Sequence, residues 1–227
     1  MTLKPPASLV AGLLPGARLQ FTVSNRPLLP LAGAAKEITE TLWWYSYLKL
    51  NVQRGFAHLL LDTPARERFG IRALDDASRR ALVQAAVDEA VGAQTPLGHF
   101  TMWGKDSWVD TQLTPYIAEF WIKARQAGYT LDPAVLERTL ARMKQDLLNG
   151  GNAYLGFEHH EAIKFANNAY AAYVLSLSNA APIGTLRTLY NEHAKDAKTL
   201  LPLVQLSIAL RTMGDSALAD QALAAAG

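Results

Sequence analysis

A series of helix-periodic segments separated by short turns constrains this chain more than any other feature of its sequence. After Pro30, apolar residues recur at three- and four-residue spacings, and capping residues and glycines mark the ends of the segments. Asp75 or Asp76 can cap one segment, and Asp132 followed by Pro133 can open another. Such segments bury their apolar faces by packing on one another as antiparallel hairpins. The sequence therefore predicts an all-α fold for residues 31–227.

About eight helices are expected, and their arrangement follows from the absence of a fixed repeat. No period of about 34 to 40 residues emerges, which disfavours a solenoid and favours an α/α toroid of helical hairpins. Gly128 and Gly150 are expected to end two of the helices. The expected helices run over residues 34–61 with a break near 51–55, from 75 or 76 to about 91, 113–128, 132–150, 161–177, 183–194, 199–213 and 215–225.

The first thirty residues differ from the rest of the chain. Prolines and glycines punctuate them, and residues 18–23 alternate polar and apolar side chains with a period of two. One strand is not stable by itself. We therefore expect residues 1–30 to form an extended or β segment left from a neighbouring β domain.

Composition excludes several classes of function. The formal net charge is +2 and 19% of residues are charged, without a run of Lys or Arg that would follow phosphates, so no nucleic-acid partner is expected. No apolar stretch approaches the roughly 20 residues of a membrane span. The chain contains no cysteine, which excludes a disulfide, a Cys-based metal site and a thiolate nucleophile. No cofactor is expected.

The segment from Trp43 to Phe56 carries a resemblance to a known family. Together with the extended residues 21–27 and the helix-periodic run between them, it resembles the entry to the thioester domain of bacterial alpha-macroglobulins. That family usually has Tyr-Pro-Tyr-Gly-Cys-Leu-Glu-Gln, whose Cys and Gln side chains join as a reactive thioester. Here the corresponding segment lacks both groups and consists of Tyr45, Ser46, Tyr47, Leu48, Lys49, Leu50 and Asn51.

Further segments resemble the same family from residue 21 onward. They are residues 99–103, 113–120, 124–129, 200–203 and 209–215. The family's toroid usually has more helices than the eight expected here, so an incomplete ring is implied. The resemblance also implies a periplasmic or secreted parent that traps proteases after bait cleavage. This helical domain would then pack against other domains of the parent and act without covalent attachment.

Two groups of side chains are candidates for a site or a surface. Trp43, Trp44, Tyr45 and Tyr47 are too many aromatics for one helix face, so they are either covered on both sides or form an interaction patch. Glu158, His159, His160 and Glu161 form the densest ionisable cluster. Their spacing is not that of a helical metal site, so no metal is expected there. We interpret these side chains either as polar groups that cap a helix and face the solvent, or as a vestige of the site whose histidine assists thioester transfer in the family.

Two alternative functions remain open. An α/α-toroid enzyme acting on a glycan or isoprenoid would gather residues 158–161 in a deep concavity. A stand-alone interaction module would use the aromatic patch. Separately, the turn over residues 94–103 is interpreted as a brace at a helix end, with a ligand-binding role for His99 as the less favoured interpretation.

Overall fold

The computed structural model describes residues 31–40, 47–101, 109, 112–151 and 159–226. The chain divides into two units, Met1–Leu31 and Ala32–Gly227. The expected extended segment over residues 1–30 lies outside the described residues. Within the described residues there is no strand, only one isolated antiparallel bridge between Thr101 and Val109. The all-α prediction is confirmed.

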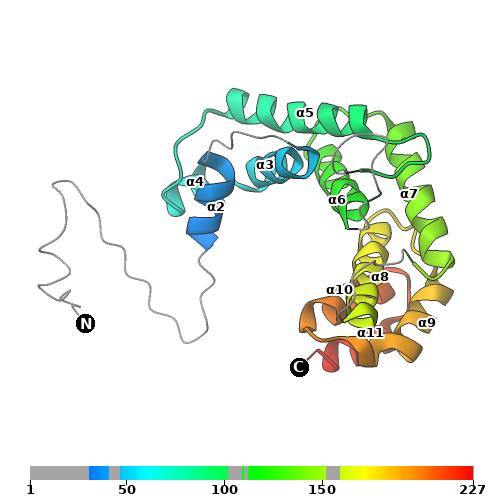
Figure 1. Ribbon diagram of the computed structural model, residues 1–227. Coiled ribbons are helices and arrows are strands. Elements are labelled where there is room, and N and C mark those ends of the chain that lie inside the picture. The colour runs from blue at the N-terminus through cyan, green and yellow to red at the C-terminus, as the bar shows by residue number, and fades with distance from the viewer. Residues whose placement is uncertain (1–30, 41–46, 102–108, 110–111, 152–158, 227) are drawn as a thin grey trace, which may run out of the picture. The chain divides into compact units, whose positions relative to one another are not determined.

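The described helices carry the labels of Figure 1. They are α2 (Leu31–Glu40), α3 (Leu48–Leu60), α4 (Thr63–Arg68), α5 (Asp76–Ala93), α6 (Leu113–Gln126), α7 (Pro133–Leu148), α8 (His160–Ser176), α9 (Ile183–His193), the 3₁₀ turn η1 (Ala194–Asp196), α10 (Leu200–Thr212) and α11 (Ser216–Ala224).

Local capping signals account for several of the helix ends. Asp75, not Asp76, is the N-cap of α5, and its carboxylate accepts a hydrogen bond from Ser78 N at 2.8 Å. Asp132 caps α7 in the same way, with Pro133 in its first turn. Gly128 and Gly150 have φ of +81° and +88°, the left-handed conformation that follows a helix end. These four predictions are confirmed.

The expected first helix is where the structure differs most from expectation. Residues 51–55 lie inside α3, so the break expected there is wrong. Gly55 is kept within the helix because α5 and α6 approach it closely: a Cβ at this position would lie under 3.0 Å from Ala86 Cβ and 3.1 Å from Phe120 Cζ. The short helix α4 was not expected, although Asp62 caps it and a proline lies in its first turn.

Two closely packed groups of helices supply most of the core. The first is the pair α3 and α5, and the second places α10 against both α8 and α11 (Figure 1). Helix α6 contacts α3, α5, α7 and α8, and its fully buried Phe120 and Trp121 belong to the one continuous hydrophobic cluster among the described residues. The buried face of α5 is narrow, because Leu82 and Val91 are exposed while Val83 and Val87 are buried.

Candidate functional site

The N-terminal end of α3 is where the sequence places the altered motif. Trp43, Trp44, Tyr45 and Ser46 lie outside the described residues. Tyr47 is the N-cap of α3 with an extended backbone, and its carbonyl accepts hydrogen bonds from Leu50 N at 3.0 Å and Asn51 N at 3.2 Å. The described part of the motif is therefore the first turn of a regular helix.

Side chains on opposite sides of this first turn are buried. Leu48 and Leu50 are each only 7% exposed, and Val52 is fully buried. Positions two apart on an α-helix point in nearly opposite directions, about 200° around the axis. Burial of both Leu48 and Leu50 therefore means that neighbouring elements enclose the helix start on more than one side.

Asn51 fixes the same turn to α5. Its side-chain amide donates to both carboxylate oxygens of Glu89, at 2.8 and 3.0 Å. The amide of Asn51 thus serves as a structural donor between two helices. This contact joins residues 38 positions apart, and no local sequence pattern predicted it.

Lys49 of the motif lines a cavity on one side of α3. The cavity has a volume of about 370 Å³ and lies among α3, α6, α8 and α10, with Tyr116 and Tyr170 in its wall. Burial, with the nearby Glu119, raises the pKa of Tyr116 to about 12 and raises that of Tyr170 still further. Tyr170 donates to Glu119 Oε2 at 2.6 Å, so both phenols stay neutral and neither offers an anionic nucleophile near neutral pH.

A second cavity, of about 470 Å³, lies beside α3 and is lined by arginines and His58. Arg66 is 3% exposed and donates to the Arg72 carbonyl at 2.6 and 2.9 Å. Its guanidinium also donates to His58 Nδ1 at 3.3 Å. Burial and the surrounding arginines lower the pKa of His58 to about 4, so this imidazole is neutral near neutral pH.

The turn at His99 braces three helices, as the favoured interpretation predicted. His99 Nε2 lies 2.7 Å from Asp146 Oδ2 of α7, and Arg142 Nε donates to Asp146 Oδ1 at 2.8 Å. Burial acts to raise the pKa of Asp146, but hydrogen bonds from His99 and Arg142 outweigh it and leave that pKa below its usual range. Phe100 is fully buried edge-on against Trp121, with ring centroids 5.2 Å apart.

The same turn is held by a second set of buried hydrogen bonds. Gln94 Nε2 donates to Thr139 Oγ1 at 2.7 Å, and Thr139 Oγ1 donates to the Gly98 carbonyl at 3.0 Å. A Cβ on Gly98 would lie 2.7 Å from the Arg138 carbonyl oxygen. The role of this turn is therefore to lock α5, α6 and α7 together. The i, i+4 spacing of Arg142 and Asp146 was a readable signal that the sequence interpretation missed.

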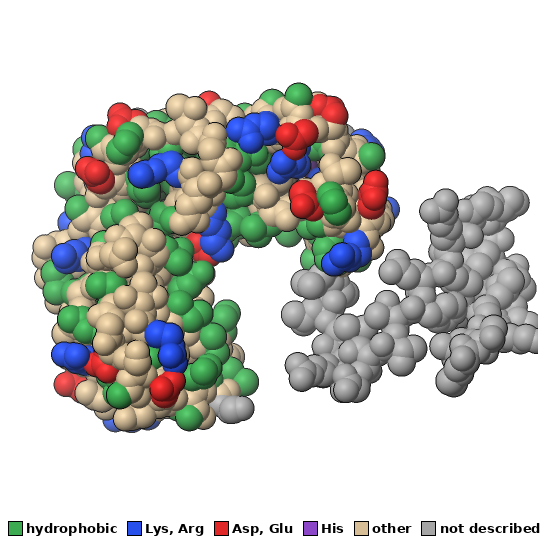
Figure 2. Space-filling view, turned by 180° about the vertical axis from the view of Figure 1, so that it is seen from behind, with side chains coloured by type: hydrophobic (Ala, Val, Ile, Leu, Met, Phe, Trp, Pro, Cys, Tyr) green, Lys and Arg blue, Asp and Glu red, His purple; other side chains and the backbone are tan. Residues whose placement is uncertain are grey.

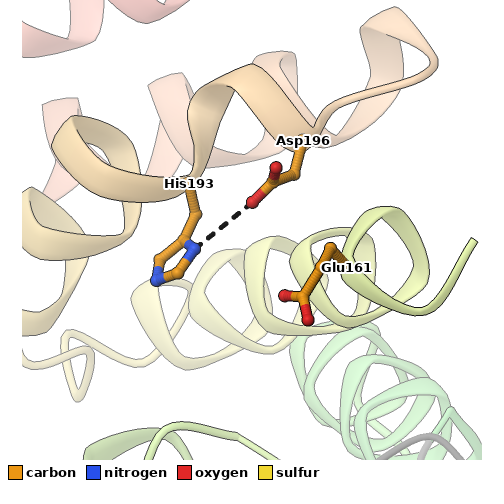
Figure 3. Close-up of side chains that lie close together, drawn as sticks. All are labelled: Glu161, His193 and Asp196. Carbon is orange, nitrogen blue, oxygen red and sulfur yellow. Dashed lines mark hydrogen bonds and ion pairs between the residues drawn. The ribbon is translucent and has the colours of Figure 1, made fainter.

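The expected ionisable cluster is only partly assembled. Glu158 lies outside the described residues, His159 is exposed with φ of +54°, and His160 begins α8. Glu161 turns toward His193 and Asp196 instead, as Figure 3 shows. The adjacent cavity of about 120 Å³ is lined by Glu161 and His193, and not by His159 or His160. The deep concavity gathering residues 158–161 that the enzyme hypothesis requires is not formed by the residues the structure describes here.

Surface charge shows no continuous patch of one sign on the described part of the face in Figure 2. Lys and Arg side chains alternate with Asp and Glu there, with apolar and uncharged polar atoms between them. Among the described residues, no helix is long and apolar enough to cross a membrane. These observations define the class of protein: a domain of helical hairpins in which the first turn of α3, which contains the altered motif, is buried and hydrogen-bonded.

Comparison with known proteins finds relatives of this chain. No family model matches the chain. Its sequence is 36% identical over 219 residues to an alpha-2-macroglobulin of Xylella fastidiosa, an alignment that spans 96% of this chain and 13% of that protein. Over nearly its whole length the chain is similar to bacterial alpha-2-macroglobulins, and it spans about an eighth of the length of the curated relatives it matches.

Solved structures of two further relatives share the fold. Native alpha-2-macroglobulin of Escherichia coli, in a structure running from domain MG7 to the C-terminus, aligns with a TM-score of 0.80 and 32% identity. The alignment covers 89% of this chain and 32% of that one. The trypsin-activated form of the same protein aligns with a TM-score of 0.75, over 81% of this chain and 13% of that chain. Salmonella alpha-2-macroglobulin reacted with methylamine aligns with a TM-score of 0.79 and 31% identity, over 88% of this chain and 13% of that chain.

Proposed function

We propose that this chain is the thioester-type helical domain of a bacterial alpha-2-macroglobulin-like protease inhibitor that traps proteases by conformational change alone. The observation that carries the proposal is the first turn of α3. Where the family resemblance implies a reactive Cys–Gln bond, Leu48 and Leu50 are buried and Asn51 is hydrogen-bonded to Glu89. The chain has no cysteine to form such a bond.

The remaining parts of the proposal concern the parent protein. Because the relatives are several times longer than this chain, we propose that it works as one domain of a larger macroglobulin in the periplasm or outside the cell. Its partners are then the neighbouring domains and the trapped protease. In this scheme residues 1–30 belong to an adjoining β domain, residues 31–227 form the helical domain, and the domain itself is not an enzyme.

One exposed apolar surface suits packing against a neighbouring domain. Leu200 and Leu201 are 61% and 62% exposed at the start of α10, and Leu201 also lines the cavity beside Lys49. Exposed leucines next to an apolar cavity are typical of a contact surface. We propose that this surface, around the altered motif, is covered by another domain of the parent, so that the motif contributes packing where a thioester would contribute a bond.

Treatment with methylamine tests the absence of reactive chemistry. A thioester is cleaved by methylamine, which leaves one amine attached to the protein. Intact-mass measurement of the 227-residue chain after treatment should show no added methylamine, whereas the Salmonella protein treated in parallel should gain one. A stoichiometric adduct on any residue of this chain would overturn the proposal.

A further inference from the structure

Three potential metal ligands from two parts of the chain meet beside the start of α8. They are Glu161 in the first turn of α8, His193 at the end of α9 and Asp196 at the end of η1. One ligand atom from each lies within 4.8 Å of the other two. Figure 3 shows the His193 ring and the Asp196 carboxylate facing each other, with Glu161 beside this pair on the neighbouring helix α8.

The spacing of His193 and Asp196 is better suited to a shared metal than to an ion pair. His193 Nδ1 lies 3.3 Å from Asp196 Oδ2, whereas charge-assisted N–H···O bonds are typically about 2.7–2.9 Å. The His99–Asp146 pair in the same protein is 2.7 Å apart. Two ligands of a tetrahedral zinc ion, each about 2.0–2.1 Å from the metal, are separated by about 3.3–3.4 Å.

We propose that Glu161, His193 and Asp196 bind one zinc-class divalent ion. An imidazole nitrogen with two carboxylates favours a transition metal over magnesium or calcium, which prefer all-oxygen sites. With a neutral imidazole, the two carboxylates balance the charge of the ion, and water completes a four-coordinate shell. The site is accessible, because the His193 and Asp196 side chains are 44% and 21% exposed and Glu161 is exposed.

The structural consequence is an additional connection between α8 and the α9–η1 corner, which already contact each other. Bound metal would tie the first turn of α8 to the corner formed by α9 and η1, and binding to the folded state alone would stabilise the fold. Lys164 lines the neighbouring cavity with Glu161 and His193, so its positive charge opposes the metal. This inference is independent of the trapping proposal, since it uses none of the motif residues.

Calorimetric titration of the 227-residue chain with Zn²⁺ alone, in a non-coordinating buffer at neutral pH, tests the site. The expected result is one ion per chain. The substitutions His193→Ala and Asp196→Asn should each weaken binding at least about tenfold. His160→Ala, which removes the imidazole next to Glu161, should leave affinity unchanged, and Lys164→Gln should strengthen it. The proposal is overturned if the wild type does not bind Zn²⁺. It is also overturned if His160→Ala loses binding while His193→Ala retains it.

Cobalt provides a readout that a fold defect cannot imitate. Co²⁺ bound at the proposed four-coordinate site should give intense visible absorption bands in the wild type and in His160→Ala. These bands should be absent from His193→Ala, while far-ultraviolet circular dichroism shows the same helix content for all three proteins. If the wild type gave only the weak bands of octahedral Co²⁺, and His193→Ala gave the same bands, Glu161, His193 and Asp196 would not form a metal site.

Discussion

Replacement of Gly55 by alanine tests the packing of α3 against α5. Alanine is the better helix former by about 1 kcal/mol, so an isolated helix would be stabilised by this substitution. In the structure, however, the new Cβ would lie under 3.0 Å from Ala86 Cβ and 3.1 Å from Phe120 Cζ. Carbon atoms in contact are normally about 3.5–4.0 Å apart, so α3 and α5 must separate by at least about half an ångström.

That separation disturbs the most tightly packed part of the core. Val52, Val83 and Val87 are fully buried near this contact, and overpacking of a dense core typically costs about 1–3 kcal/mol. We therefore expect Gly55→Ala to lower the free energy of unfolding by about 1–3 kcal/mol despite its better helix propensity, measured by urea unfolding with circular dichroism.

Two further variants separate packing from propensity. Gly92 lies near the end of α5 and a Cβ there meets nothing within 4 Å, so Gly92→Ala should stabilise by up to about 1 kcal/mol. In Gly55→Ala combined with Ala86→Gly, the most serious clash is removed, so the double variant should be more stable than the sum of the single effects predicts. Stabilisation by Gly55→Ala alone, or strict additivity in the double variant, would refute the reasoning.

Four further substitutions probe the cap of α5, the turn at His99 and the buried histidine. Asp75→Ala should lower the free energy of unfolding by about 1 kcal/mol, whereas Asp76→Ala should have the smaller effect, because only Asp75 caps α5; urea midpoints compare them. Thr139→Val keeps the shape of the side chain but leaves the Gly98 carbonyl without its buried donor, and should cost about 1–3 kcal/mol in the same assay. The pKa of His58 is lowered from 6.5 to about 4 in the folded protein. On acidification, His58 of the unfolded chain therefore binds a proton at a higher pH than His58 of the folded protein. Stability should therefore fall by up to about 3 kcal/mol as the pH falls from 6.5 to about 4. His58→Gln should flatten this part of a pH series of thermal midpoints, and an unchanged slope would contradict the assignment.

Local signals in the sequence were enough to predict helix ends. Asp132 with Pro133, and Gly128, act through hydrogen bonds and dihedral angles within a few residues, so the pattern contains the whole cause. Gly55 shows the limit of this approach. Its helix-breaking tendency is worth about 1 kcal/mol, and contacts with α5 and α6 that no local pattern encodes outweigh it.

The side chains that form candidate sites were harder to predict, because distant segments assemble them. His99 reaches Asp146, which lies 47 positions further along the chain. Glu161, His193 and Asp196 come from three different elements, α8, α9 and η1. The sequence interpretation grouped Glu161 with its neighbours His159 and His160, but consecutive positions on a helix point in different directions. Recognition of the altered motif depended instead on a resemblance spread over many segments, which relatives with the same fold now support.

Mixing the proposed parent protein with a protease tests the proposed trapping without a covalent bond most directly. The full-length protein would be mixed with trypsin and analysed by native and by denaturing electrophoresis. We expect trypsin to co-migrate with the parent protein on the native gel and to be released entirely on the denaturing gel. A trypsin adduct that survives denaturation and maps to residues 31–227 would contradict the account, as would a cleaved parent that retains no trypsin on the native gel.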